Sequence, residues 1–143
     1  MIPTTISVPA RGPVGALLWQ AKVLAKREAE ERHFKRICSR DIAAGIPALR
    51  RLVACAQNDT GQSARVAAFI IGCYNGRSFP VDLTSLRWLD LPFSDDILAV
   101  LAMDRWHKQE VHLYIEDGEA IFQKLIKDWS FDAAFREQNA SSL

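Results

Sequence analysis

The sequence predicts an all-α (mainly α) fold: a single small helical domain of about five to six helices, with an extended N-terminal arm and a charged first helix. Two patterns predict this class. Apolar residues recur at the three- and four-residue spacing of helices, and capping or turn residues separate the apolar runs. The 143 residues, of which 49% are hydrophobic and 24% charged, suit one globular domain.

The N-terminal part divides into an arm and a charged helix. Residues 1–13 contain three prolines and little apolar periodicity, which favours an extended arm and shows no secretory signal pattern. Residues 14–40 form a predicted helix whose middle is charged on nearly every side, as in a solvated helix. A sustained coiled coil is disfavoured, because the heptad through Leu17 and Leu24 falls next on Glu31.

The helical core is expected over residues 41–130, followed by a short tail over residues 131–143. Asp41 is the expected N-cap of a helix over residues 42–57. Proline is damaging beyond the first turn of a helix, so the segment 45–47, with proline at its end, is a candidate restart point within this helix.

Residues 62–74 carry the clearest helical pattern, since apolar residues recur there at offsets of three, four and seven. Asn75 and Gly76 follow it and accept the left-handed conformation in which many helices end. The candidate N-terminal caps of this helix are Asp59, Thr60 and Ser63.

Shorter elements are expected after this helix. Asp82 is the predicted cap of a short helix that Pro92 ends, and Ser94 or Asp95 is the predicted cap of the next helix. The apolar residues of segment 110–115 fit both a strand and a helix, so its structure stays open. A last helix is expected from about Gly118 to Trp129.

A series of short motifs lies in order between Gly45 and Met103. The motifs are Gly45-Ile46-Pro47-Ala48-Leu49-x-Arg51-Leu52, Asp59-Thr60-Gly61-Gln62-Ser63, Val66-Ala67-x-Phe69, Asn75, Asp82-Leu83-Thr84-x-Leu86, Asp90 and Asp95-Asp96-x-Leu98-x-Val100. Together they resemble an uncharacterised proteobacterial domain family of unknown function that is often linked to plasmids and integrated mobile elements. The resemblance implies a bacterial setting and no mechanism.

No motif indicates an enzyme, a metal site or a cofactor, and none is expected. The glycine spacing around Gly61 matches neither a dinucleotide-binding nor a P-loop motif. His107 and His112 are five residues apart, which places them on different faces of a helix. The odd number of cysteines, each in a segment that reads as helical, indicates buried free thiols in the cytoplasm. The balance is against an enzyme.

The charge of the chain is unevenly distributed. Residues 1–55 hold ten Lys and Arg residues against four Asp and Glu residues, whereas residues 56–143 hold eight and thirteen. The basic half suits nucleic acid, an acidic partner, or the acidic half of the same molecule or of a neighbour. Four tryptophans are many for so small a domain, and Trp106, with the most polar neighbours, is expected to be exposed as an interface anchor.

We therefore expect a small cytoplasmic bacterial accessory protein without catalytic activity, which acts by binding another protein or by self-association. The alternative is nucleic-acid binding through the basic N-terminal half, and no membrane contact is expected. The candidate binding residues are Arg50, Arg51, Asp59, Thr60, Gln62, Asn75, Arg77 and Trp106.

Overall fold

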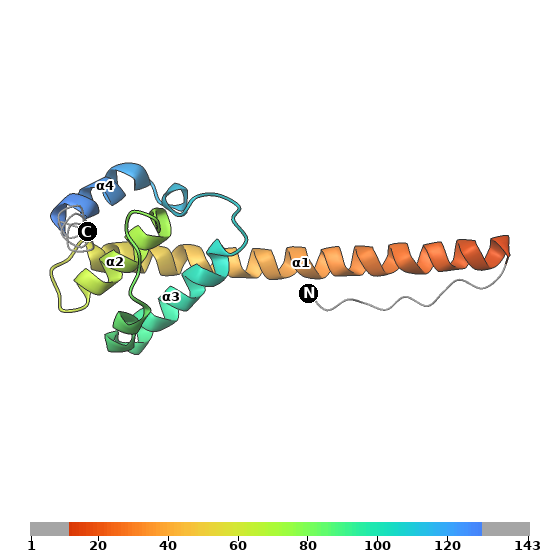
Figure 1. Ribbon diagram of the computed structural model, residues 1–143, viewed down its shortest axis with the longest axis horizontal. Helices are drawn as coiled ribbons and strands as arrows, with labels where there is room; N and C mark the ends of the chain where they lie inside the picture. Colours follow the sequence, from red (N-terminus) through yellow and green to blue (C-terminus); the bar gives the residue numbers. More distant parts are fainter. Residues whose placement is uncertain (1–11, 130–143) are drawn as a thin grey trace, which may run out of the picture. The chain divides into compact units, whose positions relative to one another are not determined.

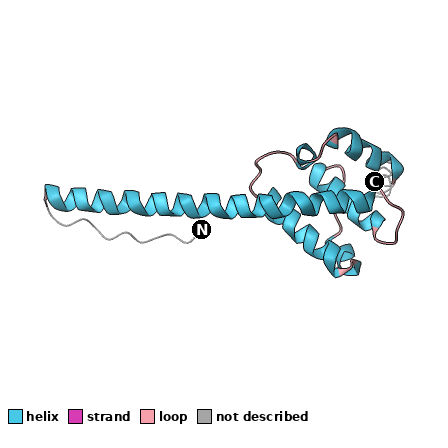
Figure 2. Ribbon diagram, turned by 180° about the vertical axis from the view of Figure 1, so that it is seen from behind, coloured by secondary structure: helices cyan, strands magenta, loops and turns pink. Residues whose placement is uncertain are grey.

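The computed structural model describes residues 12–129, and within this range every regular element is a helix (Figures 1 and 2). The predicted all-α class is confirmed. The α-helices are α1 (Pro13–Ala56), α2 (Ser63–Tyr74), α3 (Leu91–Asp104) and α4 (Gly118–Asp128), and the short 3-10 helices are η1 (Leu83–Trp88) and η2 (Val111–Tyr114). The chain divides into two units, residues 1–39 and residues 40–143.

In the first unit, α1 presents several large apolar side chains to solvent. Val14, Leu17, Leu18 and Leu24 are 58–70% exposed. The next part of α1 is charged and mostly exposed, as the sequence predicts for a solvated helix.

Helix α1 contributes residues to both units and has no break at Asp41. The prediction of two separate helices, with Asp41 as the N-cap of the second, is therefore wrong. The proposed restart at Pro47 is also wrong, because Pro47 lies inside the helix. Proline removes one backbone hydrogen bond and costs a helix interior about 3 kcal/mol. Complete burial of the next two residues, Ala48 and Leu49, offsets this cost.

All four α-helices contribute to one apolar core in the second unit. There, α2, α3 and α4 surround the C-terminal end of α1 (Figure 1). This arrangement follows from the apolar spacing of each helix, which places its buried residues on one side. The core side chains that are at most 2% exposed include Leu49 and Leu52 of α1, Val66 and Ile70 of α2, Val100 and Met103 of α3, and Phe122 and Leu125 of α4.

Two glycines mark places where elements pack too closely for a side chain. A Cβ added to Gly45 of α1 would overlap the side chain of Met103 at the end of α3. A Cβ added to Gly118 would overlap the carbonyl group of His112 in η2. Neither position tolerates a larger residue without movement of its neighbour.

The ends of α2 differ from their prediction. Gln62 occupies the N-cap position and its side chain makes no capping hydrogen bond, so none of the predicted caps, Asp59, Thr60 and Ser63, is the N-cap residue. At the other end, Asn75 has φ −151° and is not left-handed. The non-glycine residues with positive φ within residues 12–129 are His107 and Asp117.

The later elements correct one prediction and confirm another. Helix α3 begins at Leu91, before Ser94 and Asp95, which are therefore not its caps. Asp82 does cap η1, since its Oδ1 accepts the backbone N–H of Thr84 at 2.9 Å. Segment 110–115, which the sequence left open, contains the 3-10 helix η2. The predicted tail and residues 1–11 of the predicted arm lie outside the described residues.

Candidate functional site

Helix α3 is apolar on two opposite sides. Its inner side carries Ile97, Val100 and Met103, which are at most 2% exposed and belong to the core. Its other side carries Leu91, Leu98 and Leu101, which are 72%, 62% and 43% exposed. Offsets of seven and ten residues place these three leucines along one face of a helix. We call them the α3 outer face.

Such a helix departs from the ordinary pattern of a domain surface. A helix at the edge of a domain normally has one apolar stripe and a polar opposite face, whereas one that is apolar all round is buried. The outward residues of α4 follow the ordinary pattern, with Glu119, Gln123, Lys124 and Lys127 all exposed. The α3 outer face is therefore a candidate interaction surface.

Trp88 lies three residues before the start of α3 and is also largely exposed. Its residue exposure is 71%, whereas Trp19, Trp106 and Trp129 are partly buried. The expectation that Trp106 is the exposed tryptophan is therefore wrong. Trp88 is the exposed tryptophan instead. Tryptophan is a favoured anchor of protein interfaces.

The side chain of Gln62 braces the backbone between η1 and α3. Its Oε1 accepts the backbone N–H of Asp90 at 2.9 Å, and its Nε2 donates to the carbonyl oxygen of Trp88 at 3.4 Å. Both bonds join the start of α2 to the segment that carries Trp88 and Leu91. Gln62, a candidate binding residue from the sequence, thus positions the apolar surface through the backbone.

The ion pair between Arg51 and Asp96 joins α1 to α3. The Arg51 Nε atom lies 3.0 Å from Asp96 Oδ2, and Nη2 lies 2.7 Å from Oδ1, so the contact is bidentate. Asp96 is 8% exposed, and its hydrogen bonds raise the pKa of Arg51. The guanidinium of Arg51 therefore has an internal partner.

Asp41 holds the end of α3 against α1. Its Oδ2 accepts hydrogen bonds from Arg105 Nη2 at 2.7 Å and from Trp106 Nε1 at 2.9 Å, and its Oδ1 accepts from Arg40. The hydrogen bonds from Trp106 and Arg105 lower the pKa of Asp41 to about 2. Arg105 also stacks on the Trp106 ring, 4.7 Å from its centroid. This contact explains why Trp106 is partly buried.

The other candidate residues lie on separate elements. Arg50 is exposed on α1, and Arg77 is exposed after α2. The Thr60 N–H donates to Ser63 Oγ at 3.0 Å, and Asn75 Oδ1 accepts the N–H of Ser78 at 3.2 Å. Thr60 and Asn75 thus shape turns at the two ends of α2.

A polar cluster joins α2, η2 and α4. Tyr74 Oη donates to Glu119 at 2.9 Å and accepts from Gln123 Nε2 at 3.0 Å. The Tyr74 ring packs edge-on against His112, with 5.1 Å between centroids, and His112 Nε2 lies 3.4 Å from Glu119. The same ring packs against the buried Phe122. The cluster ties three elements together beside the core.

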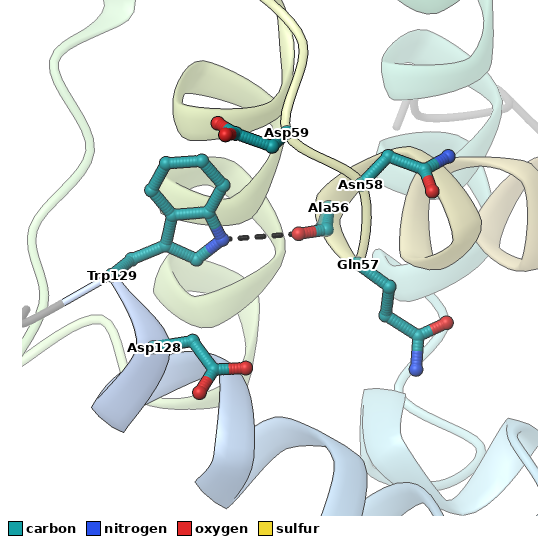
Figure 3. Close-up of a pocket in the computed structure, with 6 residues that line it drawn as sticks. All are labelled: Ala56, Gln57, Asn58, Asp59, Asp128 and Trp129. Atoms are coloured by element: carbon teal, nitrogen blue, oxygen red, sulfur yellow. Dashed lines mark hydrogen bonds between the residues drawn. The ribbon is translucent and has the colours of Figure 1, made fainter.

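A polar pocket of about 300 Å³ lies where the end of α1 meets the end of α4 (Figure 3). Asp59, a candidate binding residue, lines it together with Asp128 and Trp129. Trp129 Nε1 donates to the carbonyl oxygen of Ala56 at 3.0 Å and so satisfies the C-terminus of α1. Within residues 12–129, no group of three metal-type side chains is brought together, here or elsewhere.

The leucines of the α3 outer face are apparent in the sequence. Helical periodicity alone does not separate them from the core residues of the same helix. Leu91, Leu98 and Leu101 alternate with the inward Ile97 and Val100, so the apolar residues span more than one helical face.

None of the described helices is long and apolar enough to cross a membrane.

Comparison with known proteins identifies a family and no activity. No curated protein and no solved structure matches the chain. The family match begins at residue 46 and runs to residue 130, past Met103, where the resemblance in the sequence ends. The chain belongs to the family of unknown function DUF7673, which its residues 46–130 match.

Proposed function

We propose that this protein is a small cytoplasmic bacterial accessory protein that acts without catalysis, by docking a protein onto the α3 outer face. The observation that carries the proposal is the exposure of Leu91, Leu98 and Leu101 opposite the core side of the same helix. Exposed apolar patches of this kind mark interaction sites, because water contact with them is unfavourable.

The surroundings of the face also suit protein docking. Trp88 provides a large, exposed apolar side chain three residues before α3 begins, and Gln62 fixes the backbone that carries this tryptophan. At the far end of α3, the bonds of Asp41 to Arg105 and Trp106 fix the last turn. A rigid apolar surface loses little conformational entropy on binding.

The charge count alone favours nucleic-acid binding through the basic N-terminal half, and two ion pairs within the protein weaken this argument. Arg40 and Arg51 are both engaged by carboxylates, at 3.1 Å and 2.7 Å. A phosphate-binding surface needs cations that are available to phosphate groups. The remaining basic residues of α1, including Arg50, carry this alternative.

The proposal is tested by photo-crosslinking in the native cells. A benzophenone amino acid replaces Leu98 in one strain and Lys124, an exposed residue of α4, in a matched control strain. We expect a discrete crosslinked protein species from position 98 and none from position 124. The absence of a crosslink from position 98 would contradict docking at this face.

A further inference from the structure

We infer that the N-terminal part of α1, residues 13–27, binds along an anionic lipid surface, with an exposed apolar stripe turned towards the acyl chains. The inference goes beyond the proposed function, because these residues belong to the first unit and the α3 outer face belongs to the second. We call the stripe the α1 stripe, and it consists of Val14, Leu17, Leu18, Ala21 and Leu24.

The α1 stripe has the geometry of a helix that lies on a surface. Its other members follow Val14 at offsets of three, four, seven and ten residues, which places them on one face. Val14 and Leu24 are therefore about 15 Å apart along the helix. Ala21 is exposed, and the four larger side chains are 58–70% exposed. Contact of such a continuous apolar face with water is unfavourable.

Basic residues flank the α1 stripe. Residues 12–27 contain three basic residues and no acidic residue. Lys22 and Lys26 lie on one side of the stripe, and Arg27 lies on the other. Each is about 100–140° around the helix from Ala21, the central residue of the stripe. Their long side chains can therefore reach lipid phosphates while the stripe faces the acyl chains.

The three cations are available to an anionic surface. Among residues 12–129, no carboxylate lies in ion-pair contact with Lys22, Lys26 or Arg27. Arg40 and Arg51 on the same helix differ, because each is engaged by an aspartate. Charge complementarity therefore points to an anionic partner for residues 13–27.

The sequence also limits the extent of the contact. Glu28 follows Leu24 by four residues and so lies in line with the α1 stripe. Glu30 and Glu31 come directly after it. An anionic surface repels these carboxylates, and the inferred contact therefore ends at Arg27.

An anionic lipid surface suits these features better than a second copy or another protein. Two copies paired along the α1 stripe would gather only like charges around the contact. In the described part of the first unit, α1 is the single regular element, so no second element forms a groove with it for a protein. A bilayer supplies an apolar layer and negative head groups in one surface, which matches both the stripe and its cations.

The expectation of no membrane contact rests on the lack of a segment that could span a bilayer. A helix that lies on the surface buries one apolar face and needs no such length. The inferred contact is of this second kind.

The first test is flotation of the full-length protein with phosphatidylcholine vesicles that contain about 30% phosphatidylglycerol. We expect the protein to float with these vesicles and to stay behind with vesicles of phosphatidylcholine alone. Added salt is expected to weaken binding, because it screens the head-group charge. A protein that does not bind the anionic vesicles would overturn the inference, and so would equal binding to both kinds of vesicle.

Matched variants test the stripe and its cations separately. Leu17→Gln is expected to weaken binding about fivefold or more, because it removes apolar area from the contact. Leu83→Gln is its control, since Leu83 is 71% exposed and lies in η1. Lys22→Gln is expected to weaken binding about fivefold, and Lys124→Gln, at an exposed position of α4, is its control. Circular dichroism confirms that each variant is folded. Wild-type binding by Leu17→Gln or by Lys22→Gln would overturn the inference.

A second test locates the contact on the helix. A benzophenone amino acid replaces Leu18 in the α1 stripe or Glu30, which is exposed on the opposite face. With the anionic vesicles, we expect position 18 to gain the mass of a lipid on illumination and position 30 to gain none. Equal lipid crosslinking at the two positions would overturn the inference. In cells, a protein crosslinked at position 18 in place of a lipid would show that a protein covers the stripe, which would also overturn it.

Discussion

Asp41 and Arg105 are 64 residues apart in the sequence, and Arg105 Nη2 donates to Asp41 Oδ2 at 2.7 Å. The contact joins α1 to the C-terminal end of α3. Trp106 donates to the same oxygen, and the carboxylate is almost fully buried. The end of the helix that carries the α3 outer face is thus fixed by one carboxylate.

Asp41→Asn is expected to destabilise the protein at neutral pH, with a fall of several degrees in Tm, because it removes the charge that binds Arg105. The pKa of Asp41 is lowered to about 2 in the folded protein, from an ordinary value of 3.8. Its stabilisation is therefore present above pH 3.8 and is lost as the pH falls towards 2. Urea unfolding of wild type and variant between about pH 7 and pH 2 measures this, with stability curves that converge at low pH. A difference that does not depend on pH would contradict the assignment.

Asp96→Asn is expected to lower Tm by several degrees, because it breaks the bidentate contact with Arg51 and leaves a poorer partner for the guanidinium. The neighbouring Asp95→Asn is the matched control, since Asp95 is exposed. Thermal unfolding at low protein concentration compares the two. Equal effects of the two substitutions would show that the ion pair contributes nothing specific.

Gly118→Ala is expected to destabilise the protein by about 2 kcal/mol or more, since the added Cβ overlaps the backbone carbonyl of His112. Gly61→Ala is the control, because a Cβ there has no neighbour within 4 Å. Chemical denaturation of both variants tests the close approach of η2 to α4. A Gly118→Ala protein as stable as the wild type would show that the approach is looser.

Leu52→Ala is expected to cost about 2–5 kcal/mol of unfolding free energy, because Leu52 is fully buried. Leu98→Ala is expected to cost less than about 0.5 kcal/mol in the purified protein, since Leu98 is 62% exposed. Denaturation of both variants at low concentration separates folding from docking. A large cost for Leu98→Ala in the purified protein would assign that leucine to the fold.

Cys73 is expected to resist thiol reagents in the folded protein. Burial raises its pKa to about 12, so almost no thiolate is present at about pH 8. Reaction with a chromogenic disulfide reagent is expected to be slow in buffer and fast in urea. Rapid reaction of Cys73 in buffer would contradict its burial.

Much of the fold follows from local patterns in the sequence. The spacing of Val66, Phe69 and Ile70 predicts the buried side of α2, and all three are at most 3% exposed. Asp82 caps η1 as predicted, because its bond to Thr84 spans only two residues. Helical periodicity and short-range caps are properties of a short segment, so a single sequence contains them.

Some errors are local, such as the caps of α2 and α3, and others involve partners that are distant in the sequence. Asp41 has the side chain of an N-cap, and its use as the acceptor for Arg105 depends on a contact across 64 residues. Gln62 likewise reads as the first residue of a helix until its bonds to Trp88 and Asp90 are known. The α3 outer face was missed for a related reason. Apolar spacing shows that a helix has apolar sides, and only the packed structure shows which of them the core covers.

The most direct test of the central claim, that the α3 outer face is a docking surface, is hydroxyl-radical footprinting of Leu91, Leu98 and Leu101. Their oxidation is compared between the native cells and dilute purified protein. Leu83, which is 71% exposed and lies outside the face, serves as the internal reference. We predict that the three leucines are protected in cells relative to Leu83 and reactive in dilute protein. Equal reactivity in both settings would contradict the claim.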